Sequence, residues 1–144
     1  MFRTPYLIAA SVATLLVSSA PVFGQSSVPA GGHVIVVKLV TKGGSAPYGF
    51  EPTNITAQNG DTLRFVEDAG VMHNVHFKTH PAGAKLGAAT AGPYLTAKGQ
   101  TYDVVVDARF TNGRYEFVCD PHEMLGMRGI LTVSDGAVAA NHTK

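Results

Sequence analysis

The chain has 144 residues, with 11 Lys and Arg against 10 Asp and Glu, and its formal net charge is +1. This near-balance gives neither the basic surface typical of nucleic-acid-binding proteins nor an acidic tail. The length is sufficient for one domain with a hydrophobic core. The single cysteine excludes a disulfide within the chain.

The N-terminal segment has the composition of an export signal. Arg3 is followed by an uncharged apolar run from Leu7 to Ala20, and small residues come next. We therefore predict a signal peptide at residues 1–24 that is cut after Gly24, with an uncleaved membrane anchor as the alternative. The protein is expected in the periplasm or otherwise exported, without stable membrane insertion once the signal has been cut.

Short β-type runs alternate with turn residues across 33–134, which we expect to be a single domain. Residues 25–32 are expected to be a flexible lead-in, and residues 135–144 a flexible tail. The expected strands share a high content of Val, Ile and aromatic residues; they are 33–41, 54–58, 61–66, 71–78, 99–106, 114–119 and 129–133. Residues 79–98 are rich in Ala and Gly and predict a short helix or a long loop.

Apolar side chains alternate along several of these runs, so one face of each strand is apolar. Tyr115, Phe117 and Cys119 share such a face, which predicts that the cysteine points inward at the end of a core strand. The dipeptide Asn112-Gly113 before this run predicts a hairpin turn. Seven or eight short strands in about 100 residues, with no sustained helical period, predict an all-β, single-domain Greek-key β-sandwich.

The most specific motif is the loop Cys119-x2-His122-x4-Met127, with His73 far upstream. Two imidazoles, one thiolate and one thioether are the ligand set of a blue-copper electron-transfer centre. Pro121 stiffens the turn, so a cysteine at the end of a strand and the following histidine can face one ion. The sequence thus predicts a site for one copper ion (Cu+/Cu2+).

Two of these ligand positions have alternatives. Met124 comes only two residues after His122, which leaves little slack for both side chains to reach one ion. Met127 is therefore favoured as the weak axial ligand, and Met124 as a packing or docking residue. His76 lies three positions after His73 and would point to the opposite face of an extended strand. His73 is favoured because it begins the expected strand, where an ion site at one end of a sandwich would lie.

The chain resembles the cupredoxins, in particular the plastocyanin and pseudoazurin group. The segments that carry the resemblance are 50–52, 59–65, 73–75, 115–122 and 126–127, and the spacing of the ligand loop is their most specific feature. The resemblance implies four copper ligands, namely His73, Cys119, His122 and Met127. It also implies that the backbone N–H of Asn74 donates to the Cys119 sulfur, a contact that tunes the reduction potential.

The resemblance also implies where partners bind. In this family the exposed edge of the loop histidine is the electron port, so redox proteins are expected to dock transiently near His122, Met124 and Leu125. Plant plastocyanins carry a tyrosine before the copper cysteine and acidic clusters beside it. This chain has Val118 and a single acidic pair at 67–68, so a plant-type docking mode is not implied. We expect the protein to be a monomer.

Four protein ligands leave no open position for a substrate, so we expect an electron carrier and not an enzyme. The predicted function is the shuttling of single electrons between redox partners by Cu(I)/Cu(II) cycling. The alternative is a periplasmic copper carrier or storage protein, because the same ligand types hold Cu(I). A nitrite reductase or multicopper oxidase would need further copper centres, and the six histidines include no His-x-His pair.

Overall fold

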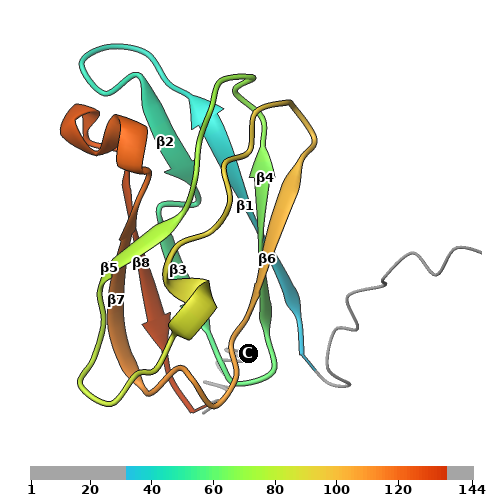
Figure 1. Cartoon of the computed structure of the whole chain (residues 1–144), viewed down its shortest axis with the longest axis vertical. Coiled ribbons are helices and arrows are strands. Elements are labelled where there is room, and N and C mark those ends of the chain that lie inside the picture. Colours follow the sequence, from blue (N-terminus) through green and yellow to red (C-terminus); the bar gives the residue numbers. More distant parts are fainter. Residues whose placement is uncertain (1–31, 136–144) are drawn as a thin grey trace, which may run out of the picture.

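The computed structural model describes residues 32–135, which form two four-stranded sheets that face each other (Figure 1). The strands in chain order are β1 (Val34–Thr41), β2 (Tyr48–Glu51), β3 (Asn54–Ala57), β4 (Thr62–Glu67), β5 (His76–Thr79), β6 (Thr101–Val105), β7 (Gly113–Val118) and β8 (Arg128–Val133). There are also two short 3-10 helices, η1 (Gly87–Thr90) and η2 (Asp120–Leu125). The predicted signal peptide, nearly all of the predicted lead-in and nearly all of the predicted tail lie outside the described residues.

One sheet has the strand order β2-β1-β4-β6 and the other the order β3-β8-β7-β5. The pairs β1–β4 and β3–β8 are parallel, and the remaining pairs are antiparallel. Between β2 and β7 each successive strand belongs to the opposite sheet, so the chain crosses repeatedly from one layer to the other. This arrangement confirms the predicted all-β sandwich.

The inner faces of both sheets meet in an aromatic core. Phe117 of β7 lies with its ring centroid 4.8 Å from that of Phe50 in β2 and 5.6 Å from that of Phe65 in β4. Tyr115, Phe117 and Cys119 are fully buried, as their alternation predicted. Burying each large side chain contributes about 1.5–3 kcal/mol, so this core holds the end of β7 firmly in place.

Three features of the chain path differ from the sequence-based expectation. The strand expected at 71–78 is regular only over β5, because the residues before it form an isolated bridge with the 91–98 segment. Strand β2 was not expected; it lies between two prolines, Pro47 and Pro52, and pairs with β1. The long irregular stretch at 79–98 contains the single short helix η1, in agreement with the prediction.

The predicted hairpin turn at Asn112-Gly113 is wrong. The strands on either side of it, β6 and β7, lie in different sheets and do not pair. Gly113 is needed there for another reason, because a Cβ atom at this position would lie 2.6 Å from Cγ of Pro81. The glycine thus permits close packing of the 81–83 loop and has no role in a two-residue turn.

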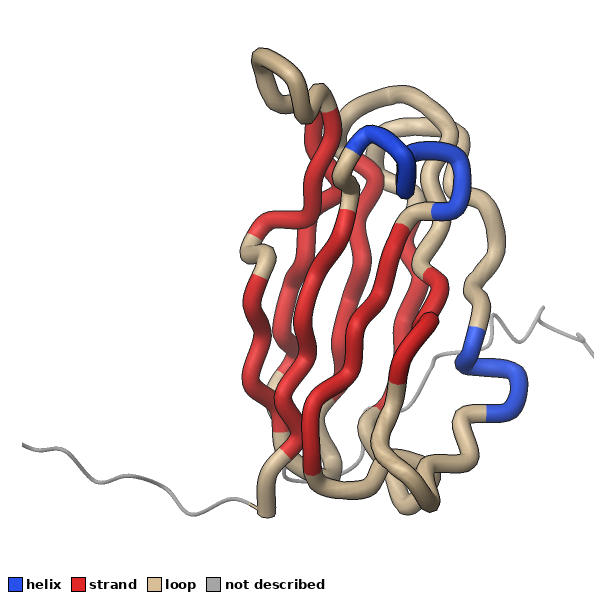
Figure 2. Tube along the Cα trace, turned by 90° about the vertical axis from the view of Figure 1, so that its left-hand side faces the viewer, coloured by secondary structure: helices blue, strands red, loops and turns tan. Residues whose placement is uncertain are grey.

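The loop before β5 and the helix η2 after β7 lie at the same end of the sandwich (Figures 1 and 2). In both views η2 lies at the upper end of the strands, whereas η1 lies lower, beside the sheets. The fold therefore brings the two segments that carry the predicted ligands to one end of the sandwich. Among residues 32–135, neither short helix could span a membrane.

Candidate metal centre

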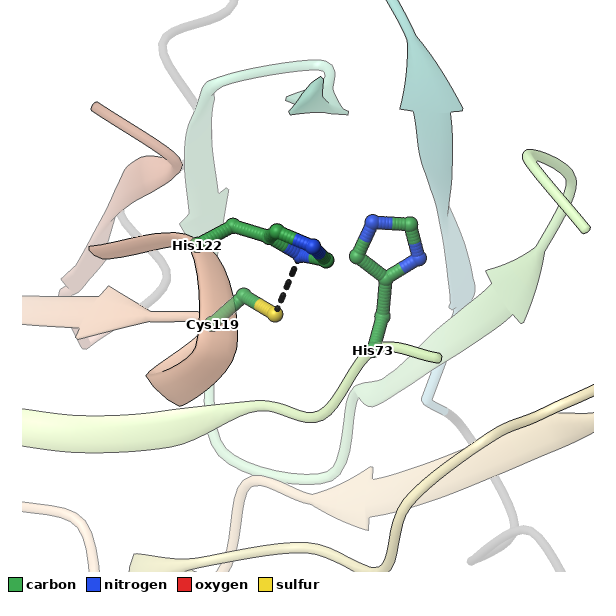
Figure 3. Close-up of side chains that lie close together, drawn as sticks. All are labelled: His73, Cys119 and His122. Atoms are coloured by element: carbon green, nitrogen blue, oxygen red, sulfur yellow. Dashed lines mark hydrogen bonds between the residues drawn. The ribbon is translucent and has the colours of Figure 1, made fainter. Parts of the chain in front are cut away.

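Three of the four predicted ligands form one cluster at this end of the sandwich. His73, Cys119 and His122 each offer a donor atom, and these atoms lie within 4.8 Å of one another (Figure 3). Sγ of Cys119 lies 3.4 Å from Nδ1 of His122. His73 and Cys119 are fully buried, whereas His122 is half-buried. Imidazole and thiolate donors in such a group suit a soft or borderline transition metal.

Strand β7 and helix η2 together set the positions of Cys119 and His122. Cys119 follows directly after β7 and precedes the first residue of η2. Pro121 lies in the first turn of this helix, where its missing N–H costs no hydrogen bond. The backbone N–H of His122 donates to the carbonyl of Cys119 at 3.0 Å, which closes the turn. The two side chains therefore come from one rigid turn.

The chain re-enters the core at Met127, directly after this turn. Its side chain is fully buried, and its backbone N–H donates to the carbonyl of His122 at 3.1 Å. The N–H of Cys119 donates in turn to the carbonyl of Met127 at 3.2 Å. Met124, in contrast, is 94% exposed. Of the two methionines weighed for the axial position, Met127 is thus the one that lies in the core.

Asn74 links the loop that carries His73 to the loop that carries Cys119. Its Nδ2 donates to the Asp120 carboxylate at 2.7 Å, and its Oδ1 accepts the Asp120 backbone N–H at 2.8 Å. His76 lies on the outer side of this link, with Nδ1 2.9 Å from the Asp120 carboxylate. The alternative ligand His76 therefore pairs with a carboxylate and lies outside the donor cluster.

The surroundings of Cys119 act on its thiol in two directions. Burial raises the pKa of the Cys119 thiol, while hydrogen bonds from the backbone N–H groups of Asn74 and His122 act to lower it. The N–H of Asn74 is the donor that the family resemblance implied. Since the thiol pKa is raised overall, a metal cation is needed to keep this sulfur as a thiolate at neutral pH.

Burial lowers the pKa of His122, and the nearby His73 lowers it further. Both effects favour the neutral imidazole, which is the form that binds a metal. The site is thus built for a cation and disfavours protonation of His122.

Two residues next to the cluster were missed by the sequence reasoning. The ring of Tyr48 lies with its centroid 4.1 Å from that of His122 and 5.3 Å from that of His73. Glu67 is fully buried, and its Oε2 lies 2.8 Å from Nδ1 of His73. Tyr48 lies in the unexpected strand β2, and Glu67 was noted only as part of an acidic pair. The signal for Glu67 was a carboxylate that directly follows the apolar residues Phe65 and Val66 at the end of β4.

The hydrogen bonding of His73 gives a further reason to expect a metal. Nε2 of His73 is buried and has no hydrogen-bond partner among the described residues. A buried nitrogen without a partner is costly, and binding of the imidazole to a metal ion would compensate for this cost. The residues present therefore fit a metal ion bound between His73, Cys119 and His122.

Comparisons with known proteins identify a family of copper-binding proteins. Residues 32–134 match the family described as copper binding proteins, plastocyanin/azurin family. A plastocyanin from Ulva prolifera is 41% identical over 100 residues, which cover 68% of this chain and 97% of the relative. A plastocyanin from Scenedesmus fuscus is 37% identical over 101 residues, which cover 69% of this chain and 98% of the relative.

Solved structures show the same similarity. The oxidized plastocyanin from Dryopteris crassirhizoma superposes with a TM-score of 0.57 at 29% identity, over 69% of this chain and 100% of that protein. The pseudoazurin from Methylobacterium extorquens gives a TM-score of 0.52 at 28% identity, over 72% of this chain and 76% of that protein.

A β-sandwich that carries a His, Cys and His donor group at one end defines a cupredoxin. The chain belongs to the plastocyanin/azurin family of copper-binding proteins. Its cofactor is one copper ion. The family resemblance seen in the sequence is thereby confirmed.

Proposed function

We propose that the protein is an exported electron carrier whose copper ion is bound by His73, Cys119, His122 and Met127. The observation that carries the proposal is the donor group of His73, Cys119 and His122 within 4.8 Å at one end of the sandwich. Met127 is included because it is buried in the same loop and supplies a thioether. When bound, copper supplies one-electron chemistry by cycling between Cu(I) and Cu(II).

The rigidity of the two ligand segments supports electron transfer. The hydrogen bonds between Cys119, His122 and Met127 hold the ligand loop from within. The paired hydrogen bonds between Asn74 and Asp120 hold this loop against the segment that carries His73. Donors fixed by the fold keep the same geometry in both oxidation states, so each electron transfer requires little rearrangement of the protein.

His122 provides the route for electrons between the buried site and the surface. It is the only half-buried member of the donor group in the described chain, and the exposed Met124 and Leu125 follow it in the loop. We propose that a reduced partner delivers one electron through the His122 edge and that an oxidised partner later removes it there. No covalent bond forms or breaks in either step. A small apolar contact of this kind suits short-lived docking of a monomer.

The charged residues beside the ligand loop are paired with one another. Lys78 lies 3.3 Å from the Asp120 carboxylate and 3.5 Å from that of Glu123. Arg128 lies 2.8 Å from the carboxylate of Glu116. Because both signs of charge are interspersed, we propose that docking depends mainly on the apolar residues and not on an acidic cluster.

The burial of the donors weighs against the alternative functions. A copper carrier must offer its ligands to a partner protein, yet His73, Cys119 and Met127 are fully buried. An enzyme needs an open coordination position, which a set of four protein ligands does not leave. We therefore favour an electron carrier over a copper carrier and over a catalyst. Export by a signal peptide at 1–24 remains part of the proposal, and N-terminal sequencing of the secreted protein tests it.

The experiment that tests the function is a visible and EPR spectrum of the protein with one equivalent of Cu(II), followed by ascorbate. We expect an intense visible band and a narrow copper hyperfine splitting that vanish on reduction and return on reoxidation. A pale complex with ordinary copper splitting, or a protein that retains only Cu(I), would favour copper carriage instead.

A further inference from the structure

The helix η2 carries the ligand His122 but has no hydrophobic anchor of its own. None of its six side chains is buried, and Met124 is 94% exposed. A surface helix normally keeps its place by burying one apolar face against the rest of the protein. Since η2 lacks such a face, polar contacts are left to hold it between the buried residues at its two ends, Cys119 and Met127.

Glu123 fastens η2 to two strands of the sheet β3-β8-β7-β5. Its Oε2 lies 3.5 Å from Nζ of Lys78 in β5, and its Oε1 accepts a hydrogen bond from Nη2 of Arg128 in β8 at 3.3 Å. Strand β7, which leads into Cys119, lies between those two strands, so the carboxylate spans it. Because Glu123 follows His122 directly, any movement of η2 away from the sheet also moves the ligand histidine.

Further ion pairs support these two contacts. Lys78 also lies 3.3 Å from the carboxylate of Asp120, the other acid of η2. Nη1 of Arg128 donates to the carboxylate of Glu116 in β7 at 2.8 Å, which anchors the guanidinium group on the sheet. A single exposed ion pair contributes little to stability, but several charges that pair with one another contribute more. The network therefore holds η2 where hydrophobic packing does not.

We propose, on the basis of the copper site proposed above, that Glu123 is a positioning residue that latches η2 onto the sheet. The latch consists of Glu123, Lys78 and Arg128, and it keeps His122 beside Cys119 both with and without copper. Because the latch acts through charge, the fixation of the ligand loop depends on the ionic strength of the solution. The latch thus controls how readily the loop that carries His122 opens.

Glu116 provides a matched control. Its side chain is 32% exposed, close to the 30% of Glu123, and it pairs with the same Arg128. It belongs to β7, so its ion pair does not join η2 to the sheet. Glu123→Gln and Glu116→Gln each remove one negative charge and keep the shape of the side chain. Only the first substitution removes a contact between η2 and the sheet.

The first readout is amide hydrogen exchange in the copper-free protein, measured by NMR. The N–H of Gly126 donates to the carbonyl of Glu123 at 3.0 Å. The N–H of Met127 donates to the carbonyl of His122 at 3.1 Å, so exchange of these two amides reports the opening of η2. We expect Glu123→Gln to accelerate this exchange by about threefold or more, and Glu116→Gln by less than about twofold. Unchanged exchange of the β7 amides shows that both variants are folded.

Salt distinguishes a latch that acts through charge from a simple loss of packing. Raising sodium chloride from about 0.01 to about 1 M shortens the screening length from about 30 to about 3 Å. Exchange of the two amides, corrected for the intrinsic rate, should then accelerate by about threefold or more in the parent and stay nearly unchanged in Glu123→Gln. A parent that does not respond to salt would overturn the latch. So would a Glu123→Gln variant that exchanges like Glu116→Gln.

The second readout is the rate at which copper passes from the loaded protein to a chelator. His73 and Cys119 are fully buried, so an ion leaves on the side of the half-buried His122. We expect Glu123→Gln to release copper at least about three times as fast as Glu116→Gln at low salt. The parent should approach the faster variant at high salt.

Two outcomes separate this inference from the proposed function. Equal release rates in the two variants, with the blue-copper spectrum intact, would overturn the link between the latch and copper while leaving the electron-carrier function standing. If the parent itself lacks a blue-copper spectrum, the proposed function fails and the link to copper fails with it. Amide exchange in the copper-free protein still decides in that case whether Glu123 holds η2.

Discussion

The side chain of Asn74 and the residue Asp120 make two hydrogen bonds to each other, of 2.7 and 2.8 Å, across 46 positions of sequence. Asn74 follows His73 directly, and Asp120 follows Cys119 directly. This pair therefore ties together two ligand segments that belong to different parts of the chain. The metal site is assembled by the protein itself and does not depend on the ion to bring its ligands together.

Replacing Asn74 tests this link. Asn74→Ala leaves the Asp120 N–H without its acceptor and removes one donor from the Asp120 carboxylate, so the free energy of unfolding of the copper-free protein should fall by about 1–3 kcal/mol. Copper should also pass to a chelator faster than from the parent. Urea unfolding and chelator kinetics measure the two effects. Asn54→Ala, at an exposed position of β3, is the control. Equal stability of the two variants would contradict the role given to Asn74.

Replacing Cys119 tests the origin of the expected colour. Cys119→Ser should abolish the intense visible band, because a hydroxyl group cannot supply the thiolate donor. The substitution changes one atom, so the far-UV circular dichroism of the copper-free protein should stay that of the parent. Titration with Cu(II) under absorbance measures the result. An unchanged spectrum in this variant would end the blue-copper interpretation.

The two methionines of the ligand loop should respond differently to the same substitution. Met127→Leu removes the weak axial sulfur and should keep a coloured site while raising the potential by about 59 mV or more, a tenfold change in the Cu(II)/Cu(I) ratio. The near-equal volume of Leu limits the loss in stability to about 1.5 kcal/mol or less. Met124→Leu, at an exposed position, should change neither colour nor potential. Voltammetry compares the two, and a larger shift in the Met124 variant would reverse the assignment.

The lowered pKa of Asp61 predicts how the stability of the copper-free protein changes in acid. Burial alone would raise the pKa of Asp61, but hydrogen bonds from the backbone N–H groups of Gln58 and His33 lower it below 3.8. The unfolded chain therefore takes up a proton first, and the stability that Asp61 contributes is present above pH 3.8 and is lost as the pH falls through the lower folded pKa.

Asp61→Asn tests this dependence. At pH 7 the variant should unfold with a free energy about 1–3 kcal/mol lower than the parent, because the amide can accept at only one of its two terminal atoms. This difference in unfolding free energy should narrow below pH 3.8, because protonation of Asp61 removes the extra stability of the parent. Urea unfolding at several pH values measures it. A difference that stays constant with pH would rule out the titration of Asp61 as its cause.

The features that could be predicted from the sequence are those set by local pattern. Alternation of apolar residues placed Tyr115, Phe117 and Cys119 in the core, and the spacing of the ligand loop placed His122 beside the cysteine. His73 was preferred as the start of a strand, yet it lies in a loop that only bridges to Leu95 before β5 begins. The prediction therefore named the residue that joins the cluster, but the reason given for it, a position at the start of a strand, does not hold in the structure.

The features that could not be predicted depend on contacts between distant strands. Tyr48 reaches both histidines because β2 pairs with β1 at the edge of the first sheet, and nothing in the short Tyr48–Glu51 segment indicates that pairing. Glu67 meets His73 because the turn at Gly70 folds the chain back onto the end of β4. Local sequence indicates an acidic pair at 67–68 but not which member is buried.

The unequal exposure of the donors limits how the proposed carrier can work. His73, Cys119 and Met127 are sealed from solvent, and only His122 reaches the surface among the four. Both the supplier and the recipient of the electron must then occupy the same small area, one after the other. A complex of three proteins with the carrier in the middle is geometrically disfavoured, and an excess of either partner should slow the overall flow by blocking access for the other.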